Sequence, residues 1–212
     1  LVIAALIQFG GLGFMTFAIL VLTSLQGKMG LSGSITAQEA LGTHSNQIGS
    51  TAKAVIKIAF ITEGLGFLGL TLLLAPLKGL KDAMYEAFFL CISAFNNAGF
   101  ALNGNNMTAY VHQPMISFII SLLIITGGIG FLVILDIIKH KRWQKFTLHT
   151  KVMVLGTLAL NIIGCILYWL LERHNAKTIG GLSEAGQWFA SWFMAVASRT
   201  AGFNNVDYSQ VT

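Results

Sequence analysis

Charge is scarce in this chain. Charged residues make up 10% of its 212 positions and hydrophobic residues 55%, with a mean hydropathy of +0.73. Soluble domains carry about 25% charged residues, so the composition excludes an ordinary soluble globular protein. We expect an all-α integral membrane protein with several spans.

Patterns typical of catalysis and metal binding are missing as well. Cys91 and Cys165 lie in apolar runs, which indicates small buried side chains rather than a disulfide or a metal pair. The five histidines are scattered without metal-ligand spacing, and the sequence has no nucleophile–base pair or phosphate-binding loop. We therefore expect no enzyme, no cofactor and no resident metal in this chain.

The net charge of +5 does not indicate a nucleic-acid partner, because the basic residues gather in two places. Three belong to the loop after the first apolar run and the start of the next, and five fill the loop after the third: Lys28, Lys53, Lys57, Lys139, Lys141, Arg142, Lys145 and Lys151. Loops rich in lysine and arginine stay on the cytoplasmic side of a membrane. Both loops are predicted to be cytoplasmic.

Four apolar runs are long enough to cross a bilayer, at residues 1–25, 50–74, 114–138 and 152–171. Each holds about 20–25 residues, enough for roughly 30 Å of hydrocarbon. Pro114 falls in the first turn of its run, where the missing N–H costs nothing, and Pro76 is expected to close the second run. The first run begins at Leu1 without an initiator Met, which suggests a piece of a longer protein.

Two further segments, residues 82–106 and 184–207, are too short to cross. Their apolar cores of about 13 residues fit a re-entrant helix better than a span. Each core is followed by the same tripeptide, Ala98-Gly99-Phe100 in the first segment and Ala201-Gly202-Phe203 in the second. Irregular backbone at membrane depth is tolerated only where it is buried in protein or lines a water-filled path.

The order of these elements repeats along the chain. Gly10-Gly11-Leu12-Gly13-Phe14 recurs 117 positions later as Gly127-Gly128-Ile129-Gly130-Phe131, the stretch at Glu63 recurs 98 positions later at Asn161, and Ala-Gly-Phe recurs after 103. Three signals in one order indicate duplication. We predict the inner helix of a first repeat in residues 1–27, a complete second repeat of outer helix, pore loop and inner helix in residues 50–139, and a third repeat lacking its inner helix in residues 148–212.

The charge pattern decides between two topologies. If residues 82–106 dip into the membrane and return, the two Gly-Gly motifs run in the same direction and both basic loops lie on one side. If this segment crossed, the basic loops would lie on opposite sides. The positive-inside rule therefore favours the dip.

Glycine at the end of each dip suggests a path for a cation. Backbone carbonyls replace the water around a cation when they turn inward, and glycine accepts the dihedral angles that this requires. The short helix before each glycine adds the partial negative charge of its C-terminal end. We predict an ion pathway lined by Asn96, Asn97, Ala98, Gly99, Phe100, Thr200, Ala201, Gly202 and Phe203.

These repeated units resemble the Ktr/Trk/HKT superfamily of potassium transport subunits, whose pores are related to those of potassium channels. Residues 93–100 look like the second selectivity filter of that family, residues 198–203 like the third, and residues 8–14 like the inner helix of its first repeat. The short loops make the bacterial KtrB-type subunit the most similar subfamily.

The resemblance implies function and partners. It implies transport of K⁺ across the bacterial plasma membrane by a multi-pass subunit in contact with lipid, through four repeats around one pore. It further implies a homodimer on a cytoplasmic nucleotide-binding regulatory ring, with Na⁺ as a candidate activator.

Several residues are expected to support the filter rather than to contact the ion. Arg199 is predicted to brace its loop against a carboxylate, either Glu86 or Glu184. The glycines of the repeated motif, Gly10, Gly11, Gly13, Gly127, Gly128 and Gly130, are predicted to let inner helices approach closely.

Other interpretations stay open. Gly99 and Gly202 could cap helices, Arg199 could snorkel to the outer surface, and Glu63, inside a span, could be a structural partner or could tune the pore. The whole chain could also be a secondary transporter with parallel repeats and a midplane site, or a membrane-embedded enzyme or assembly factor. A second carboxylate, His or Cys facing Glu63 would favour these alternatives.

Overall fold

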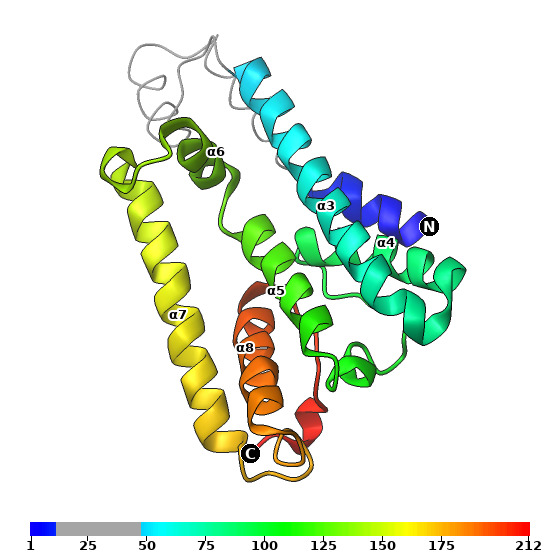
Figure 1. Cartoon of the computed structure of the whole chain (residues 1–212). Helices are drawn as coiled ribbons and strands as arrows, with labels where there is room; N and C mark the ends of the chain where they lie inside the picture. Colours follow the sequence, from blue (N-terminus) through cyan, green and yellow to red (C-terminus); the bar gives the residue numbers. More distant parts are fainter. Residues whose placement is uncertain (12–47) are drawn as a thin grey trace.

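The computed structural model describes residues 1–11 and 48–212. These residues form helices and turns and contain no strand, which confirms the predicted all-α fold (Figure 1). In chain order the helices are Val2–Gly11 at the N-terminus, α3 (Ile48–Lys78), α4 (Leu80–Phe95), α5 (Pro114–Gly128), α6 (Phe131–His140), α7 (Leu148–Glu172) and α8 (Glu184–Thr200), with short 3-10 turns η2 (Thr108–Tyr110), η3 (Trp143–Lys145) and η4 (Tyr208–Gln210). The predictions for Gly13 and Lys28 lie outside the described residues.

Two helices of the described part are long and apolar enough to cross a membrane. They are the Ala54–Lys78 portion of α3 and the whole of α7, each 25 residues long. Helices α5 and α6 would together make a third span, but their axes differ by 94°. The chain is therefore a multi-pass membrane protein, as predicted.

The third apolar run is not the continuous helix predicted over residues 114–138. Helix α5 ends at Gly128, and α6 begins at Phe131 after Gly130, which has a φ of 98°. A left-handed backbone is open to glycine but strained for residues with a β-carbon, so Gly130 allows the chain to turn here. The repeated glycine motif thus coincides with a break in the helix that carries it.

The prediction that Pro76 closes the second span is also wrong. Pro76 lies inside α3, which continues to Lys78 and is extended by a hydrogen bond of 3.0 Å from the Gly79 N–H to the Ala75 carbonyl. The helix stops at Gly79, whose φ of 82° turns the chain into α4. Proline removes only its own N–H, so in a last turn it does not force the helix to end there.

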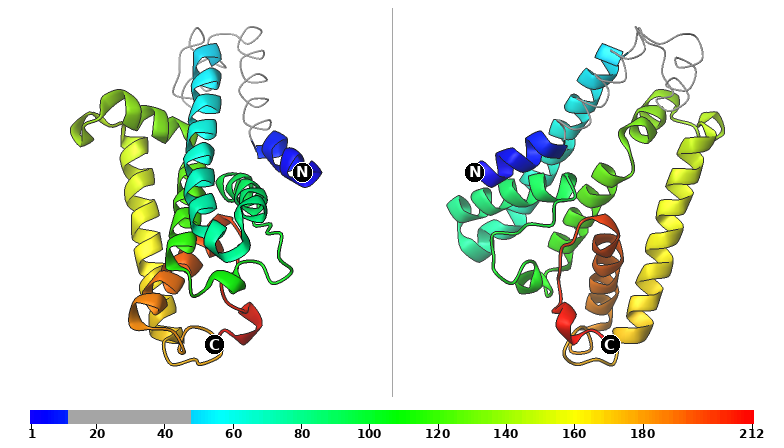
Figure 2. Two further views of the ribbon diagram at one scale, coloured as in Figure 1. Left: turned by 45° about the vertical axis from the view of Figure 1, so that its right-hand side comes forward. Right: turned by 180° about the vertical axis from the view of Figure 1, so that it is seen from behind.

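Helices α4 and α8, of 16 and 17 residues, lie in the two segments predicted to dip into the membrane and are called the re-entrant helices below. Helix α8 begins at Ser183, whose hydroxyl accepts a hydrogen bond from the Gly186 N–H at 3.3 Å, a common way to start a helix. It lies between α5 and α7, while α4 packs against α3 and α5 (Figures 1 and 2). The extended chain that follows each helix returns toward the side from which the helix came.

One core cluster joins the two re-entrant helices to α5. It contains Leu90 and Ala94 of α4, Ile120 of α5, and Phe193 and Val196 of α8, all almost fully buried. Inside a membrane such side chains stabilise the helices through close van der Waals packing, so this cluster fixes the ends of α4 and α8 relative to each other.

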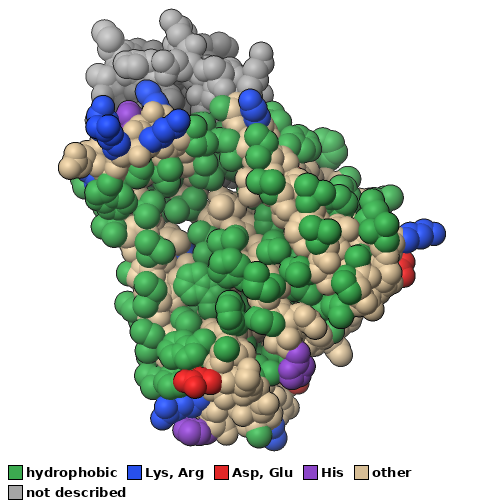
Figure 3. Space-filling model, in the orientation of Figure 1, with side chains coloured by type: hydrophobic (Ala, Val, Ile, Leu, Met, Phe, Trp, Pro, Cys, Tyr) green, Lys and Arg blue, Asp and Glu red, His purple; other side chains and the backbone are tan. Residues whose placement is uncertain are grey.

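The surface divides by chemistry along the long axis of the molecule. Hydrophobic side chains cover the middle of the face seen in Figure 3, and lysine and arginine side chains gather near α6 and the turn that follows it. Lys139, Lys141, Arg142 and Lys145 of this region are exposed. This arrangement agrees with a cytoplasmic side at α6. The end away from α6 is called the outer end below.

Candidate functional site

The two Ala-Gly-Phe loops touch each other, and Phe100 and Gly202 in them are exposed. After α4 the chain passes through Asn97, with a φ of 53°, to Gly99, with a φ of 73°. After α8 it reaches Gly202 at a φ of 72°. A β-carbon on Gly99 would collide with the carbonyl oxygen of Ala201, so the backbones of the two loops touch. The structure therefore brings together residues predicted for the ion pathway from both segments.

The interpretation of the two glycines as helix caps agrees with the structure at Gly202 but not at Gly99. Gly202 follows Ala201, the capping residue of α8, and its N–H donates to the Ala197 carbonyl at 2.9 Å. Gly99 lies three positions beyond Asn96, the capping residue of α4, and takes no part in closing that helix. A capping role therefore explains the conformation of Gly202 but not that of Gly99.

Hydrogen bonds connect the two loops at their inner ends. The Thr200 hydroxyl donates to Asn97 Oδ1 at 2.7 Å, and Asn97 Nδ2 donates to the Ile124 carbonyl of α5 at 3.4 Å. Asn97 thus joins the loop after α4 both to the end of α8 and to the helix that breaks at Gly130.

A second set of hydrogen bonds connects the loops farther out, through Asn106. Its Nδ2 donates to the Gly99 carbonyl at 3.1 Å, and its Oδ1 accepts from the Asn204 N–H at 3.3 Å. The Met107 N–H also donates to the Asn204 carbonyl at 2.9 Å. Asn106 is not among the residues predicted for the ion pathway, although asparagine is frequent after both Ala-Gly-Phe motifs, at Asn103, Asn105, Asn106, Asn204 and Asn205.

The glycines of the repeated motif lie against the same loop. A β-carbon on Gly127 would collide with the Phe95 carbonyl, and one on Gly11 would collide with the Asn96 side chain. Gly128 leaves contact distances of 3.5 Å to the Asn97 amide. A β-carbon would fit at that distance, and Gly10 and Gly130 have open space where a β-carbon would be, so close approach explains Gly11 and Gly127 but not the other three.

The predicted carboxylate partner of Arg199 is wrong. Its Nη1 donates to Oδ1 of Asn161 in α7 at 3.1 Å, and neither ion pair found among the described residues includes Arg199. Glu184 is exposed in the first turn of α8, at the far end of that helix from Arg199. The error arose because the two carboxylates were chosen by expected depth, whereas α8 places Arg199 beside the middle of α7.

Glu86 instead connects three segments at the outer end of the second repeat. This buried carboxylate pairs with Lys78 at the end of α3 at 2.6 Å and accepts hydrogen bonds from the Tyr110 hydroxyl at 2.6 Å and from Asn103 Nδ2 at 3.0 Å. Burial, and next the hydrogen bond to Glu86, raise the pKa of Tyr110. Glu86 therefore supports the chain that follows the loop. It is far from Arg199 in the sequence and, among the described residues, shares none of its hydrogen-bond partners.

Glu63 is a buried carboxylate in the middle of α3. Gln8 Nε2 donates to it at 3.0 Å and Asn96 Nδ2 at 3.5 Å, while Asn96 Nδ2 also donates to Gln8 Oε1 at 2.9 Å. No second carboxylate, His or Cys joins these three side chains through a hydrogen bond in the described part of the chain. Cys91 of α4 lies close enough to Glu63 to interact with its charge, but forms no hydrogen bond with it.

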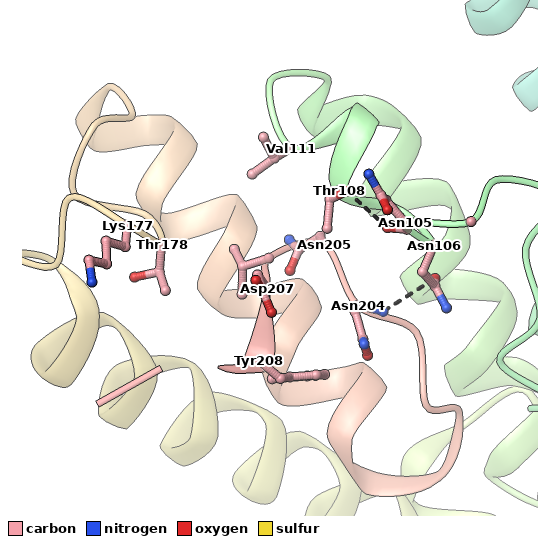
Figure 4. Close-up of a pocket in the computed structure, with 12 residues that line it drawn as sticks. Asn105, Asn106, Thr108, Val111, Lys177, Thr178, Asn204, Asn205, Asp207 and Tyr208 are labelled. Atoms are coloured by element: carbon pink, nitrogen blue, oxygen red, sulfur yellow. Dashed lines mark hydrogen bonds between the residues drawn. The ribbon is translucent and has the colours of Figure 1, made fainter. Parts of the chain in front are cut away.

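A polar hollow of about 680 Å³ opens where the two loops reach the outer end. Figure 4 shows its walls: Asn105, Asn106 and Thr108 come from the chain after the first loop, Asn204, Asn205, Asp207 and Tyr208 from the chain after the second, and Lys177 and Thr178 from the turn between α7 and α8. Amide and hydroxyl oxygens are ligands suited to hydrated cations. Among the described residues no group of three His, Cys, Asp or Glu side chains could hold a metal.

Comparison with known proteins identifies the family. The whole chain, residues 1–212, matches the family model described as TrkH, cation transport protein. Across nearly its full length the chain is 40% identical to Ktr system potassium uptake protein B of Vibrio alginolyticus, 43% to the protein of that name in Bacillus subtilis, and 34% to potassium/sodium uptake protein NtpJ of Enterococcus hirae.

The chain spans about half the length of these relatives, 47% in each case. All three are transport proteins, and two are potassium uptake proteins of Ktr systems, which confirms the resemblance stated from the sequence. The match over all 212 residues establishes that this chain belongs to the TrkH family of cation transport proteins.

Proposed function

We propose that this chain is part of a K⁺-conducting membrane subunit and that the two loops meeting at Gly99 and Ala201 form part of its selectivity filter. The observation that carries the proposal is the pairing of two left-handed glycines, at φ values of 73° and 72°, on loops whose backbones touch. The names of the three relatives, two potassium uptake proteins and one potassium/sodium uptake protein, support K⁺ as the ion.

Backbone carbonyls are the groups best placed to bind the ion. Glycine at these positions lets successive carbonyls turn to one side without a side chain in the path. Asn106 donates to the Gly99 carbonyl, but a carbonyl oxygen has two lone pairs and can accept that bond while the other pair faces an ion. The nine residues predicted from the sequence remain the proposed pathway.

The ends of the re-entrant helices would add to the attraction for a cation. Helix α4 ends at Phe95 and α8 at Thr200, each directly before its loop. A helix C-terminus carries about half a negative charge, spread over carbonyls without an intrahelical partner. Both helices would direct this charge toward the place where the loops meet.

The larger assembly is proposed from the resemblance and from the relatives' names. Two relatives belong to a Ktr system, which implies further components, and we propose a homodimer on a cytoplasmic regulatory ring that binds nucleotides. NtpJ is a potassium/sodium uptake protein, which supports a role for Na⁺ as activator or second ion. Co-purification of the full-length protein with a soluble partner, and its mass in detergent, would test this assembly.

The filter is tested by Gly99→Ser and Gly202→Ser in the full-length protein. A β-carbon should displace a carbonyl or narrow the path, so both variants should lose K⁺ uptake or admit more Na⁺ relative to K⁺. Growth at limiting K⁺ and cation flux into proteoliposomes measure the effect. Gly156→Ser is the matched control, because Gly156 of α7 has open space at its β-position. Unchanged K⁺/Na⁺ discrimination in both filter variants would reject the filter.

The topology is tested by labelling single cysteines. Cysteines in place of Lys81 and Asn106, which flank the first dip, should react with a membrane-impermeant reagent from the outer side. Cysteines in place of Lys28 and Lys145 should react only from the cytoplasmic side. Labelling of the first two positions from opposite sides would mean that the segment crosses, and would remove the pore loop from the proposal.

A further inference from the structure

The structure repeats one polar contact at the end of each re-entrant helix. In the second repeat Glu63 of α3 accepts a hydrogen bond from Asn96, the residue that follows α4. In the third repeat Asn161 of α7 accepts a hydrogen bond from Arg199, in the last turn of α8. In each case the outer helix supplies the acceptor and the end of the re-entrant helix supplies the donor.

The sequence repeat places these residues in register. Glu63 corresponds to Asn161 at the offset of 98 that relates the outer helices, and Asn96 corresponds to Arg199 at the offset of 103 that relates the Ala-Gly-Phe loops. The contacting residues are separated by 33 positions in the second repeat and 38 in the third, which reflects the five-residue difference between these offsets. The two contacts therefore occupy equivalent sites.

The charged residue is on opposite sides of the contact in the two repeats. In the second repeat the charged member is the acceptor, Glu63, and in the third it is the donor, Arg199. Each charge contacts an uncharged amide. A hydrogen bond to a charged group is roughly twice as strong as one between two neutral groups, so either polarity gives a charge-assisted bond at this site.

A third residue completes the contact in one repeat only. Gln8, on the helix before the second repeat, bonds both Glu63 and Asn96. At the offset of 117 that relates the Gly-Gly motifs, its counterpart is Ile125 of α5, which cannot form a hydrogen bond. A small void of about 10 Å³ lies there, lined by Ile125 and Arg199 among others, and the buried Nδ2 of Asn161 has no partner among the described residues.

We propose that Glu63 and Asn161 are positioning residues at equivalent sites, each holding the end of a re-entrant helix from the outer helix and thereby fixing where its conducting loop begins. Asn96 is well placed for this role, because its Nδ2 also donates to the Ile92 carbonyl of α4 at 2.9 Å. This inference rests on the proposed function in one respect: the loops that these contacts hold are taken to conduct K⁺. It predicts that the polarity of the contact can be exchanged and that its loss alters selectivity.

Transport by the full-length protein tests the effect on the loops. Glu63→Leu and Arg199→Leu should each lower the K⁺/Na⁺ flux ratio in proteoliposomes by about tenfold, since loss of a charged hydrogen bond is worth about that factor. Asp82→Asn is the matched control, because Asp82 is exposed in the first turn of α4, and it should leave the ratio unchanged. A normal ratio in folded Glu63→Leu would overturn the proposal.

Transplanting one contact into the other repeat distinguishes positioning from packing. The triple variant Ile125→Gln/Asn161→Glu/Arg199→Asn installs the second-repeat set in the third repeat, beside the existing void. It should keep a flux ratio within about threefold of the unaltered protein, whereas Arg199→Leu loses about tenfold. If the folded triple variant is as defective as Arg199→Leu, the two sites are not equivalent and the proposal is wrong.

A double-mutant cycle tests the contact itself without relying on K⁺ transport. Glu63→Gln and Asn96→Ala, singly and together, should show non-additive shifts of the thermal unfolding midpoint in detergent. Additive shifts would contradict a direct contact whatever ion the protein carries. Conversely, an unaltered protein that shows no K⁺ flux, together with a clear coupling in the cycle, would reject the proposed function and keep the positioning contact.

Discussion

The two Ala-Gly-Phe loops share the left-handed conformation of their glycines and differ in almost everything that surrounds these glycines. Gly99 and Gly202 have φ values of 73° and 72°. Yet a β-carbon on Gly99 would strike the backbone of Ala201, whereas Gly202 has open space at its β-position. What the two loops have in common is therefore the turn at glycine, and what differs is the packing and the chemistry around it.

The helix ends show the same division. Two left-handed residues, Asn97 and Gly99, lie in the loop after α4, while the loop after α8 has right-handed Ala201 and a single left-handed residue, Gly202. The supporting charge is negative in the second repeat and positive in the third, at Glu63 and Arg199. The same left-handed turn therefore forms beside different helix caps and opposite charges, provided that glycine is present where the chain turns.

The largest difference between the repeats is expected at the two filter glycines. Gly99→Ala should lower the free energy of unfolding by about 3–5 kcal/mol, because a backbone collision adds to the strain of a positive φ. Gly202→Ala should cost only about 1–2 kcal/mol, from the φ strain alone. Unfolding of the full-length protein in mixed micelles measures both. Equal losses of unfolding free energy in the two variants would show that both loops are equally crowded, and would contradict the difference described above.

The helix break provides the next contrast, between the first glycines of the two Gly-Gly motifs. Gly127→Ala should lower stability by about 2–3 kcal/mol, since its β-carbon would meet the Phe95 carbonyl, which cannot move without moving the loop. Gly10→Ala should change stability by less than about 0.5 kcal/mol, because nothing lies near its β-position. A tolerated Gly127→Ala would mean that α5 does not approach the loop this closely.

Glu86 supports the second repeat at the outer end, where Lys78, Asn103 and Tyr110 meet. Glu86→Gln should lower stability by about 2 kcal/mol, as it removes the charge from a buried ion pair whose lysine is partly exposed. Tyr110→Phe removes one hydrogen bond only and should cost about 1 kcal/mol. Thermal unfolding measures both, and a larger loss in Tyr110→Phe than in Glu86→Gln would contradict the central place of the carboxylate.

The smallest effect is expected where the third repeat is given a second charge. Asn161→Asp should stabilise the protein by up to about 1 kcal/mol, because Arg199 would then face a carboxylate of nearly the same shape as the amide. Asn161→Leu should instead lower stability by about 1 kcal/mol. If Asn161→Asp is destabilising while Asn161→Leu is neutral, Arg199 does not contact this residue.

The fold class could be predicted from the sequence, because it follows from local features. The lengths of the apolar runs indicated which helices cross and which do not, and the described α3, α4, α7 and α8 agree within a few residues of the predicted ranges at most of their ends. The Ala-Gly-Phe motifs marked the loops, since only glycine adopts their backbone without strain. These features depend on neighbours in the chain and not on packing.

The tertiary structure alone decided the contacts between distant residues. Arg199 meets Asn161 across 38 positions, and Asn106 joins two loops across 98, because α4, α5 and α8 pack in one arrangement that no local pattern specifies. The run at residues 114–138 is apolar enough for one span, and only its placement against Phe95 and Asn97 shows that it breaks at Gly130. Hydrophobicity determines which segments enter the membrane, whereas side-chain partners depend on which segments then lie side by side.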